Sequence, residues 1–580
     1  MPMIRIGRPG TPILGYEIER KELFVILGIF ALAMFLRIAY FADYKNTAVF
    51  PILPYSDGDF YYQRAQEILS GDFLGGKAFL KWPLYAYFLS FLFKISASSL
   101  FFVYTVQFII GALTCLLVYF IARLLFNSVT GFIAALMYAF YGLFVFYEGL
   151  AVYTSLSLFL NALLFLAIMD IHENPGNEKS FWSGIYLGIC TITQGNIVLF
   201  GIAGILWALW HKGVSFTKYA YHVCAFIIGL SAVLGLLFLR SYIIDKTPAI
   251  LTGNSGLNFY LGNNPQASGL LNWPKELSAT ADGMLRDARV IAKLTLKKEV
   301  TPNEASAFWM NKALEFIKND PQAYLRLLIR KTVFLFSPQE FIFEPEYYFS
   351  AEKIRVFKFM LMDLHFILPF AFLGMLVSLK NIKRSAPLYL ALATLSLGII
   401  LFFVQTKFRV TIVPYLIIFA ACGFYGLGEL IWKKKYAQAA LLVSALCLIF
   451  AALNSKSPVK IMIGNDPNTF AAFHYHFAKA VEHENKSEYP EALAELQEAE
   501  KIRPRNHNIA YSFGAIYYYM KEFDKAEAKF KEAIEISPFF VDAHDNLGFL
   551  YNNLKRFDEA FAVLKQAEFL DPDDTGVHFE

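Results

Sequence analysis

The sequence predicts a mainly α-helical protein, in which a bundle of about eleven transmembrane helices precedes a soluble α-solenoid. The chain has 580 residues, of which 57% are hydrophobic and only 17% charged. Soluble domains contain roughly 45 to 50% apolar and 25% charged residues. The C-terminal part is instead rich in charge and repeats every 34 residues. A membrane bundle and a separate helical repeat domain account for both properties.

Apolar runs of roughly 17 to 25 residues, the length that crosses a bilayer, predict the spans. The fifth and sixth are short and are separated by the residues TQGN (193–196), so we expect broken helices there. The shorter apolar run Pro83–Ile95 is expected to lie at the interface or against the bundle. The predicted spans are 23–42, 100–122, 130–147, 150–169, 181–194, 196–210, 220–239, 356–379, 386–404, 410–431 and 436–453.

Basic residues in short loops predict the orientation, because Lys and Arg are retained on the cytoplasmic side. With eleven spans the clusters at Arg20/Lys21, Lys380–Arg384 and Lys433–Lys435 fall on one side. The N-terminus is then cytoplasmic, and the loops 43–99 and 240–355 lie outside. We therefore expect a transmembrane domain at 1–455, a linker at 456–472 and an extracytoplasmic domain at 473–580.

The C-terminal domain is predicted to contain three tetratricopeptide repeats. Similar segments begin at Glu488, Glu522 and Arg556, and small residues recur in register, which lets paired helices approach closely. From Lys456 onward the chain has 14 basic and 22 acidic residues, whereas the whole chain carries +4. An acidic solenoid of this kind binds a protein or peptide partner in its concave face; a spacer without a partner is the alternative. The positions in register are Ala480/Gly514/Gly548, Ala492/Ala526/Ala560, Ala499/Ala533/Ala567 and Pro504/Pro538/Pro572.

Two acids follow the first span in the stretch YSDGDFYYQRAQEIL, Tyr55–Leu69. Apolar spacing predicts an amphipathic helix over Phe60–Leu69, with Asp57 and Asp59 just ahead of it. There the acids would cap the helix and favour its dipole. The alternative is catalytic, since a carboxylate held at the membrane boundary can accept the proton of an attacking hydroxyl.

The same stretch resembles a known family. SDGDFYYQRAQEILSGD, followed by WPLYAYFLSFLFKI and a long span, is similar to the first outer loop of the GT-C glycosyltransferases that use lipid-phosphate sugars. These include protein O-mannosyltransferases and the 4-amino-arabinose transferase acting on lipid A. GLNFYLGNNPQASG, DPQAYLRLLIRKTVFLFSPQEF and TKFRVTIVPYL resemble later family segments, in the same order. Where members carry an arginine-proline pair, this chain has Gln194 and Gly195, and Thr411 lies near a common proline.

The resemblance implies an extracytoplasmic enzyme that transfers a sugar from a polyprenyl-phosphate carrier to an acceptor hydroxyl, with inversion. Asp57 would be the general base and Asp59 a supporting or substitute acid. The leaving phosphate needs cations, and each has an alternative role at lipid head groups. The candidates are Lys331, Arg409, Arg330, Lys407 and Arg240. Tyr61, Asn258, Asn263 and Asn264 are expected to contact substrate, although Gly and Asn also serve turns generally.

No cofactor is required by the sequence, and a divalent ion bridged by Asp57 and phosphate is left open. The five cysteines lie in apolar segments without a CxxC pair, which indicates neither a disulfide framework nor a metal site. No nucleic-acid signature occurs. The resemblance suggests the bacterial inner membrane, with membrane lipid as a further partner. The competing hypothesis is a non-enzymatic scaffold or lipid carrier that recruits envelope proteins through its repeats.

Overall fold

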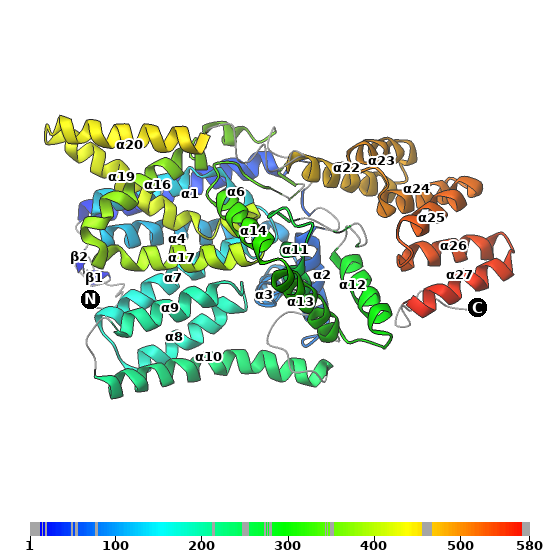
Figure 1. Ribbon diagram of the computed structural model, residues 1–580. Coiled ribbons are helices and arrows are strands. Elements are labelled where there is room, and N and C mark those ends of the chain that lie inside the picture. Colours follow the sequence, from blue (N-terminus) through cyan, green and yellow to red (C-terminus); the bar gives the residue numbers. More distant parts are fainter. Residues whose placement is uncertain are drawn as a thin grey trace.

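The computed structural model describes most of residues 12–570 and confirms a mainly α-helical chain (Figure 1). A bundle of long helices forms one part, the repeats form the other, and the helices of the two outer loops lie between them. Most of the predicted linker 456–472 is outside the described residues. Within 12–570 the structure leaves out 14–15, 18–19, 48–49, 53–55, 76–78, 80, 211–214, 246–253, 272–273, 275–276, 278–280, 343, 345, 348–352 and 455–466.

The bundle has a helix at each predicted span, but the number of membrane crossings is not confirmed. Seven described segments are long and apolar enough to cross, one of them being the joined pair at Leu364–Leu401. The expected span 130–147 is two short helices broken at Phe140–Tyr141. The bundle helices are α1 (Arg20–Tyr44), α4 (Leu100–Leu125), α5 (Ser128–Ala139), α6 (Gly142–Glu148), α7 (Thr154–Glu173), α8 (Asn177–Thr191), α9 (Ile197–Trp210), α10 (Phe216–Asp245), α16 (Leu364–Ser378), α17 (Ile382–Leu401), α19 (Val413–Trp432) and α20 (Tyr436–Asn454).

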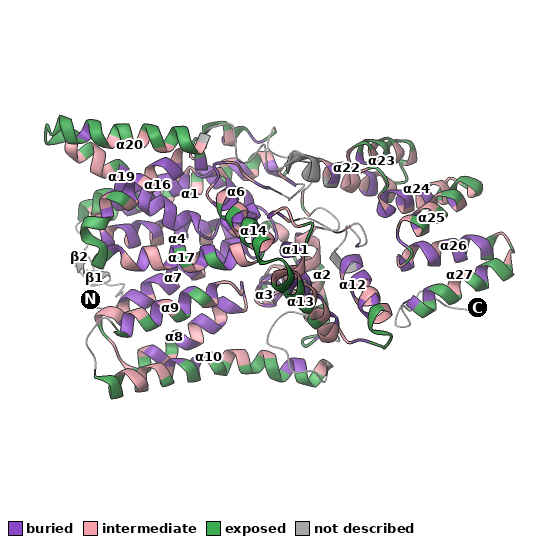
Figure 2. Cartoon of the chain, in the orientation of Figure 1, coloured by how far each residue is buried: buried purple, intermediate pink, exposed green. Residues whose placement is uncertain are grey.

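Two bundle helices expose apolar side chains over most of their length (Figure 2). Only 11% of the most apolar window of α10 and 6% of that of α20 is buried, whereas 72% of the window of α7 is buried. Leu236 and Leu448 are examples of large side chains that are about two-thirds exposed. In water these surfaces would be strongly unfavourable. Contact with lipid accounts for them, so the chain is an integral membrane protein.

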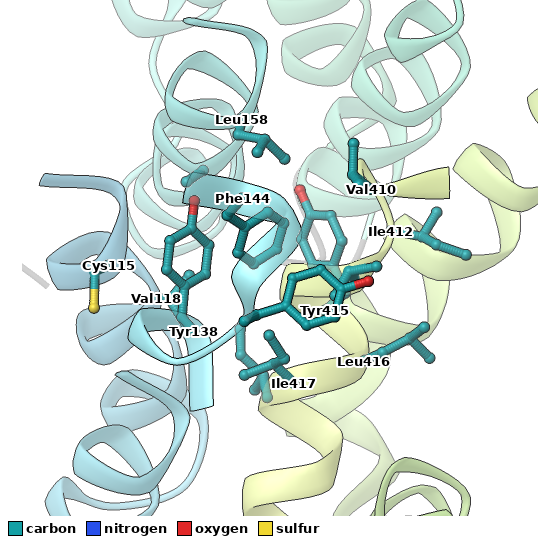
Figure 3. Close-up of a cluster of buried hydrophobic side chains, with 14 of the residues drawn as sticks. Cys115, Val118, Tyr138, Phe144, Leu158, Val410, Ile412, Tyr415, Leu416 and Ile417 are labelled. Carbon is teal, nitrogen blue, oxygen red and sulfur yellow. The ribbon is translucent and has the colours of Figure 1, made fainter. Parts of the chain in front are cut away.

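The interior of the bundle is aromatic and tightly packed (Figure 3). Tyr138 of α5 stacks on Phe144 of α6 with ring centroids 4.2 Å apart, and Tyr415 of α19 lies in the same cluster. Helices α16 and α19 approach closely, since a Cβ on Gly374 would lie 1.8 Å from the carbonyl oxygen of Phe419. A small residue at this contact lets the two backbones meet, as is usual between membrane helices.

The outer-loop helices gather at one end of the bundle, next to the repeats (Figure 1). The opposite end carries β1 (Pro12–Ile13) and β2 (Tyr16–Glu17), an antiparallel pair ahead of α1. The first loop forms α2 (Asp57–Leu69) and α3 (Leu84–Ser96). The second forms α11 (Ser255–Gly262), α12 (Ala281–Leu296), α13 (Pro302–Asn319) and α14 (Pro321–Leu335); η1 (Arg355–Phe359), η2 (Leu379–Asn381) and α18 (Thr406–Arg409) are short connections.

The described part of the C-terminal region forms three helix pairs. In the second pair a Cβ on Gly514 would meet the Phe530 ring at 2.7 Å, and in the third a Cβ on Gly548 would meet Leu564 at 2.5 Å. The small residues predicted to allow close helix contact therefore do so. The pairs are α22 (Pro467–Asn485) with α23 (Tyr489–Ile502), α24 (His507–Tyr519) with α25 (Phe523–Ile536), and α26 (Val541–Asn553) with α27 (Phe557–Leu570).

The third repeat contacts the second outer loop directly. Val290 of α12 packs in a cluster with Val541, Ala567 and Leu570. Arg286 of α12 forms an ion pair of 2.5 Å with Asp542, and Lys293 Nζ donates to the Phe569 carbonyl at 2.9 Å. The repeat region is thus attached to the loop helices at the end of the bundle.

Candidate functional site

The site begins at the N-terminus of α2. Ser56 is the N-cap, and its hydroxyl accepts a hydrogen bond from the Asp59 backbone amide at 3.3 Å. The helix therefore starts at Asp57, three residues earlier than predicted, and the acids are first-turn residues and not caps. The reason is that the shorter serine side chain satisfies the free amide, while acids in the first turn interact favourably with the helix dipole.

Asp57 lies between two lysines from distant parts of the chain. Its Oδ1 accepts from Lys81 Nζ at 2.5 Å, and its Oδ2 accepts from Lys407 Nζ. The Asp57 side chain is 36% exposed, whereas that of Lys407 is 9% exposed. Lys81 also lies over the Phe60 ring, 4.3 Å from its centroid. Three charged groups are thus held at one half-exposed point, with one more positive than negative charge.

The two predicted acids have different surroundings. Asp59 Oδ2 accepts from Gln63 Nε2 one turn further along α2, at 3.1 Å. The partners of Asp57 come from the segment just before α3 and from α18. Asp57 thus joins three segments of the chain.

Tyr61 packs inside the first outer loop. It is 1% exposed, with its ring 5.0 Å from that of Tyr85 and 6.3 Å from that of Tyr153. Its hydroxyl is buried without a hydrogen-bond partner among the described residues. The ring therefore supports the packing of α2 on α3 and on the start of α7.

Lys331 of α14 is fully buried and bonds a neutral group. Its Nζ donates to Asn263 Oδ1 at 2.8 Å, while Asn263 Nδ2 donates to the carbonyls of Phe259 and Leu401. Burial lowers the pKa of Lys331 to about 7. This amide network joins α11, α14 and the end of α17.

The two other predicted asparagines lie in or beside α11. Asn264 Nδ2 donates to the Tyr260 carbonyl at 2.9 Å, and Asn264 Oδ1 accepts from the Gln266 amide at 2.8 Å. These contacts shape the turn after α11. Asn258 is half-buried in the middle of the helix.

Two predicted arginines are anchored on backbone carbonyls. Arg409 donates to the carbonyls of Ser337 at 2.8 Å and Gln339 at 2.5 Å and pairs with Glu340. Arg240 donates to the Leu74 carbonyl at 2.8 Å, and its guanidinium lies 3.7 Å from the centroid of the Phe79 ring. Both side chains therefore fix loop segments.

Arg330 has a weaker contact, donating to the Ser268 carbonyl at 3.5 Å, and its side chain is half-buried. Of the five predicted cations, Lys407 is the one that the structure joins directly to Asp57.

Sequence reasoning missed Lys81 and Glu346. Lys81 carries a readable signal, since it immediately precedes the WPLYAYFL segment of the family-like loop. Glu346 gave none, because no recognisable motif surrounds it in the segment after α14. Its carboxyl group is hydrogen-bonded to Ser56, next to Asp57, and burial raises the pKa of Glu346 to about 7.

The Gln194–Gly195 pair, found where the family carries arginine and proline, is part of the packing. Gln194 Oε1 accepts from the Ser157 hydroxyl at 2.6 Å. A Cβ on Gly195 would lie 2.2 Å from the Trp82 ring. The glycine thus makes room for the indole beside Lys81.

The part of the chain that the structure describes contains no preformed cluster of metal-binding side chains. No group of three or more His, Cys, Asp or Glu side chains there could hold an ion. A divalent ion bridged by Asp57 and a substrate phosphate therefore stays a prediction.

Both regions match known families over part of their length. Residues 81–238 match the family of dolichyl-phosphate-mannose-protein mannosyltransferases, and residues 507–540 and 541–574 each match a tetratricopeptide repeat. The first match covers a little over a quarter of the chain and begins at Lys81, after Asp57. The predicted resemblance is confirmed over these residues: part of the membrane region is similar to a family of lipid-phosphate-dependent mannosyltransferases, and the C-terminal region contains tetratricopeptide repeats.

Curated proteins gave no significant sequence match. Among solved structures, the archaeal oligosaccharyltransferase AglB from Archaeoglobus fulgidus, in complex with an inhibitory peptide and a dolichol-phosphate, is 13% identical with a TM-score of 0.39. That match covers 82% of this chain and 60% of that one. The apo form of the Archaeoglobus fulgidus oligosaccharyltransferase is 14% identical, with a TM-score of 0.38 and coverage of 81% and 59%. At such low TM-scores the similarity carries no inference about activity or individual residues.

Proposed function

We propose that this protein transfers a sugar from a polyprenyl-phosphate carrier to an acceptor hydroxyl, with inversion, and that Asp57 is the general base. The observation that carries the proposal is the placement of the Asp57 carboxylate between Lys81 and Lys407, half exposed at the end of the membrane bundle. A general base must reach its proton by a hydrogen bond, and a phosphate leaving group needs cations. Both requirements meet at this point.

In the proposed reaction the acceptor oxygen attacks the anomeric carbon from the face opposite the phosphate. The new bond joins the acceptor oxygen to that carbon, and the bond from the carbon to the phosphate oxygen breaks. The phosphate leaves with the electron pair, and the hydroxyl proton passes to Asp57. Inversion follows because a single displacement occurs.

The two lysines first neutralise the Asp57 carboxylate and then also bind the donor phosphate. Without donor they neutralise Asp57, and one more positive than negative charge remains to attract an anion. When the phosphate arrives, each ammonium group can bridge it and the carboxylate, because an ammonium has three donors. This bridging lowers the repulsion between two negative groups that the reaction needs close together.

The other predicted cations differ in how directly they are proposed to bind the donor phosphate. The contacts support Lys407 and Lys81 as the main donor-phosphate ligands, since Arg409 and Arg240 direct their N–H groups to backbone carbonyls. Arg330, at the edge of α14, is proposed to contact the phosphate or a lipid head group. Lys331 is proposed to bind the donor phosphate when its amine is protonated.

Among the substrate-loop residues, Asn258 is the proposed sugar contact. Tyr61, Asn263 and Asn264 are proposed to shape the site around it. Asp59 is proposed to support the first turn of α2 beside Asp57.

We also propose that the end carrying the outer loops and repeats is extracytoplasmic and that the membrane is the bacterial inner membrane. The shared position of loops and repeats, opposite β1 and β2, supports one side for both (Figure 1). The repeats are proposed to bind a protein or peptide.

Incubation of the purified chain with a series of polyprenyl-phosphate sugars, each radiolabelled in the sugar, tests the proposed activity. Transfer of label to an acceptor from the same envelope, with release of polyprenyl phosphate, is the expected result. A protein that binds these lipids but never releases polyprenyl phosphate would instead be a scaffold or lipid carrier.

A further inference from the structure

The repeats contain a groove that the transferase chemistry does not use. It has a volume of about 470 Å³ and is lined mainly by the first helices of the three pairs, α22, α24 and α26. Phe477 and Glu484 come from α22, Tyr511 and Tyr518 from α24, and Phe549 from α26. The groove therefore runs across all three repeats.

The walls of the groove are aromatic and held in place. The rings of Tyr518 and Phe549 lie 5.8 Å apart, and Asn546 Nδ2 donates to the Tyr511 hydroxyl at 2.6 Å. Phe549 is 53% exposed although it is a large apolar side chain. Fixed aromatic faces attract cations as well as apolar groups.

Two carboxylates line the groove, and they differ in what they contact. Asp542 is paired with Arg286 of α12 at 2.5 Å, so the chain itself supplies its cation. Glu484 has no cationic partner within the described residues, although it is half-buried. Burial raises the pKa of Glu484 to about 6, because removal from water disfavours the charged form. A cation entering the groove would offset this cost.

We infer that this groove binds a peptide through a Lys or Arg side chain that pairs with Glu484 among the aromatic rings. The inference rests on the proposed role of the repeats as a peptide-binding domain and adds the chemical class of the ligand. A peptide is favoured over a lipid head group because the groove extends over three helix pairs that lie beyond the membrane bundle (Figure 1). The net negative charge of the repeat region also favours a basic peptide.

The test uses the full chain in nanodiscs and an array of acetylated nonapeptides with mixed flanking residues and each of the twenty amino acids at the centre. We expect peptides with central Lys or Arg to bind at least about fivefold above the array mean. Glu484→Gln should abolish this enrichment. The matched control is Glu491→Gln, which removes the same charge from an exposed position on α23 outside the groove and should keep the enrichment.

The outcomes separate the inference from the proposed peptide-binding role. Binding without enrichment of Lys or Arg, or enrichment that persists in Glu484→Gln, overturns the inference but leaves peptide binding intact. Absence of binding to every peptide overturns both. Ala515→Trp, which fills the groove, should remove binding in either case; unchanged binding by this variant would place the peptides elsewhere and contradict the inference.

Discussion

Lys407 and Asp57 form an ion pair although 350 residues separate them along the chain. Asp57 begins the first outer-loop helix, and Lys407 lies in the short α18 between two late bundle helices. The site therefore forms only when both ends of the bundle domain have assembled. A substitution in either segment is therefore expected to alter the position of the Asp57 carboxylate.

Removal of either lysine should weaken donor binding. We expect Lys81→Met and Lys407→Met each to raise the KM for the polyprenyl-phosphate donor by about tenfold or more, because a charged hydrogen bond to phosphate contributes roughly 1.5 to 3 kcal/mol. Steady-state kinetics at varied donor concentration measures this. Lys94→Met, at an exposed position on α3, is the control and should leave KM unchanged. An unchanged KM in both site variants would contradict the role of the lysines.

Lys331 should make the stability of the protein depend on pH. Its folded-state pKa of about 7 lies below the ordinary value of 10.5. Between these values the unfolded chain binds a proton that the folded chain does not, so stability rises with pH by roughly 1.4 kcal/mol per unit. Below pH 7 both states are protonated, and the full cost of the buried charge applies.

Lys331→Met removes this term but leaves the oxygen of Asn263 without its donor at every pH. The melting temperature of the variant minus that of the wild type should therefore stay nearly constant between pH 6 and 7 and fall as the pH is raised from 7 to 9. Differential scanning fluorimetry of both proteins in the same detergent measures the difference. A difference that is constant across this range would show that Lys331 does not titrate there.

Arg409 should be needed for the segment between α14 and η1. Its guanidinium donates to three carbonyls, including those of Ser337 and Gln339, and a lysine cannot reach them all. Arg409→Lys should destabilise the chain by roughly 2 to 3 kcal/mol, because buried carbonyls lose their donors. A lower melting temperature with an unchanged KM for donor is the expected result. A raised KM with unchanged melting would instead make Arg409 a phosphate ligand.

The attachment of the repeats to α12 should depend more on apolar contact than on charge. The Arg286–Asp542 pair is partly exposed and is expected to contribute less than about 1 kcal/mol. Val290 is 3% exposed and packs on Val541 and Leu570, so Val290→Asp buries a charge against apolar side chains. Hydrogen exchange in α26 and α27 should increase strongly in Val290→Asp and little in Arg286→Ala. The reverse order would contradict this account of the interface.

Much of the architecture was readable from the sequence because its signals are periodic. The 34-residue repeat predicted the small residues Gly514 and Gly548, which receive Phe530 and Leu564 in the structure. Apolar runs located the bundle helices. Their ends were less accurate, as at α5 and α6, where a continuous apolar run contains a break that hydropathy does not record.

The candidate site was only partly readable, because its contacts join distant segments. The sequence singled out Asp57 and named Lys407 among five cations, but nothing local shows that these two residues pair. Glu346 was missed because no motif in the neighbouring sequence marks this carboxylate. Asn263 looked like a substrate residue, whereas its amide is bonded to Lys331 and two carbonyls, a network that depends on tertiary packing.

The central claim, that Asp57 accepts the proton of the acceptor hydroxyl, is tested most directly by comparing sugar transfer in wild type, Asp57→Asn and Asp59→Asn. The measured quantity is the rate of label transfer from a radiolabelled polyprenyl-phosphate sugar at saturating donor. We expect Asp57→Asn to lose at least about 100-fold in kcat, since general-base catalysis contributes roughly 10² to 10⁴, and Asp59→Asn to stay within a few-fold of wild type. Equal kcat for Asp57→Asn and wild type would remove Asp57 from the mechanism.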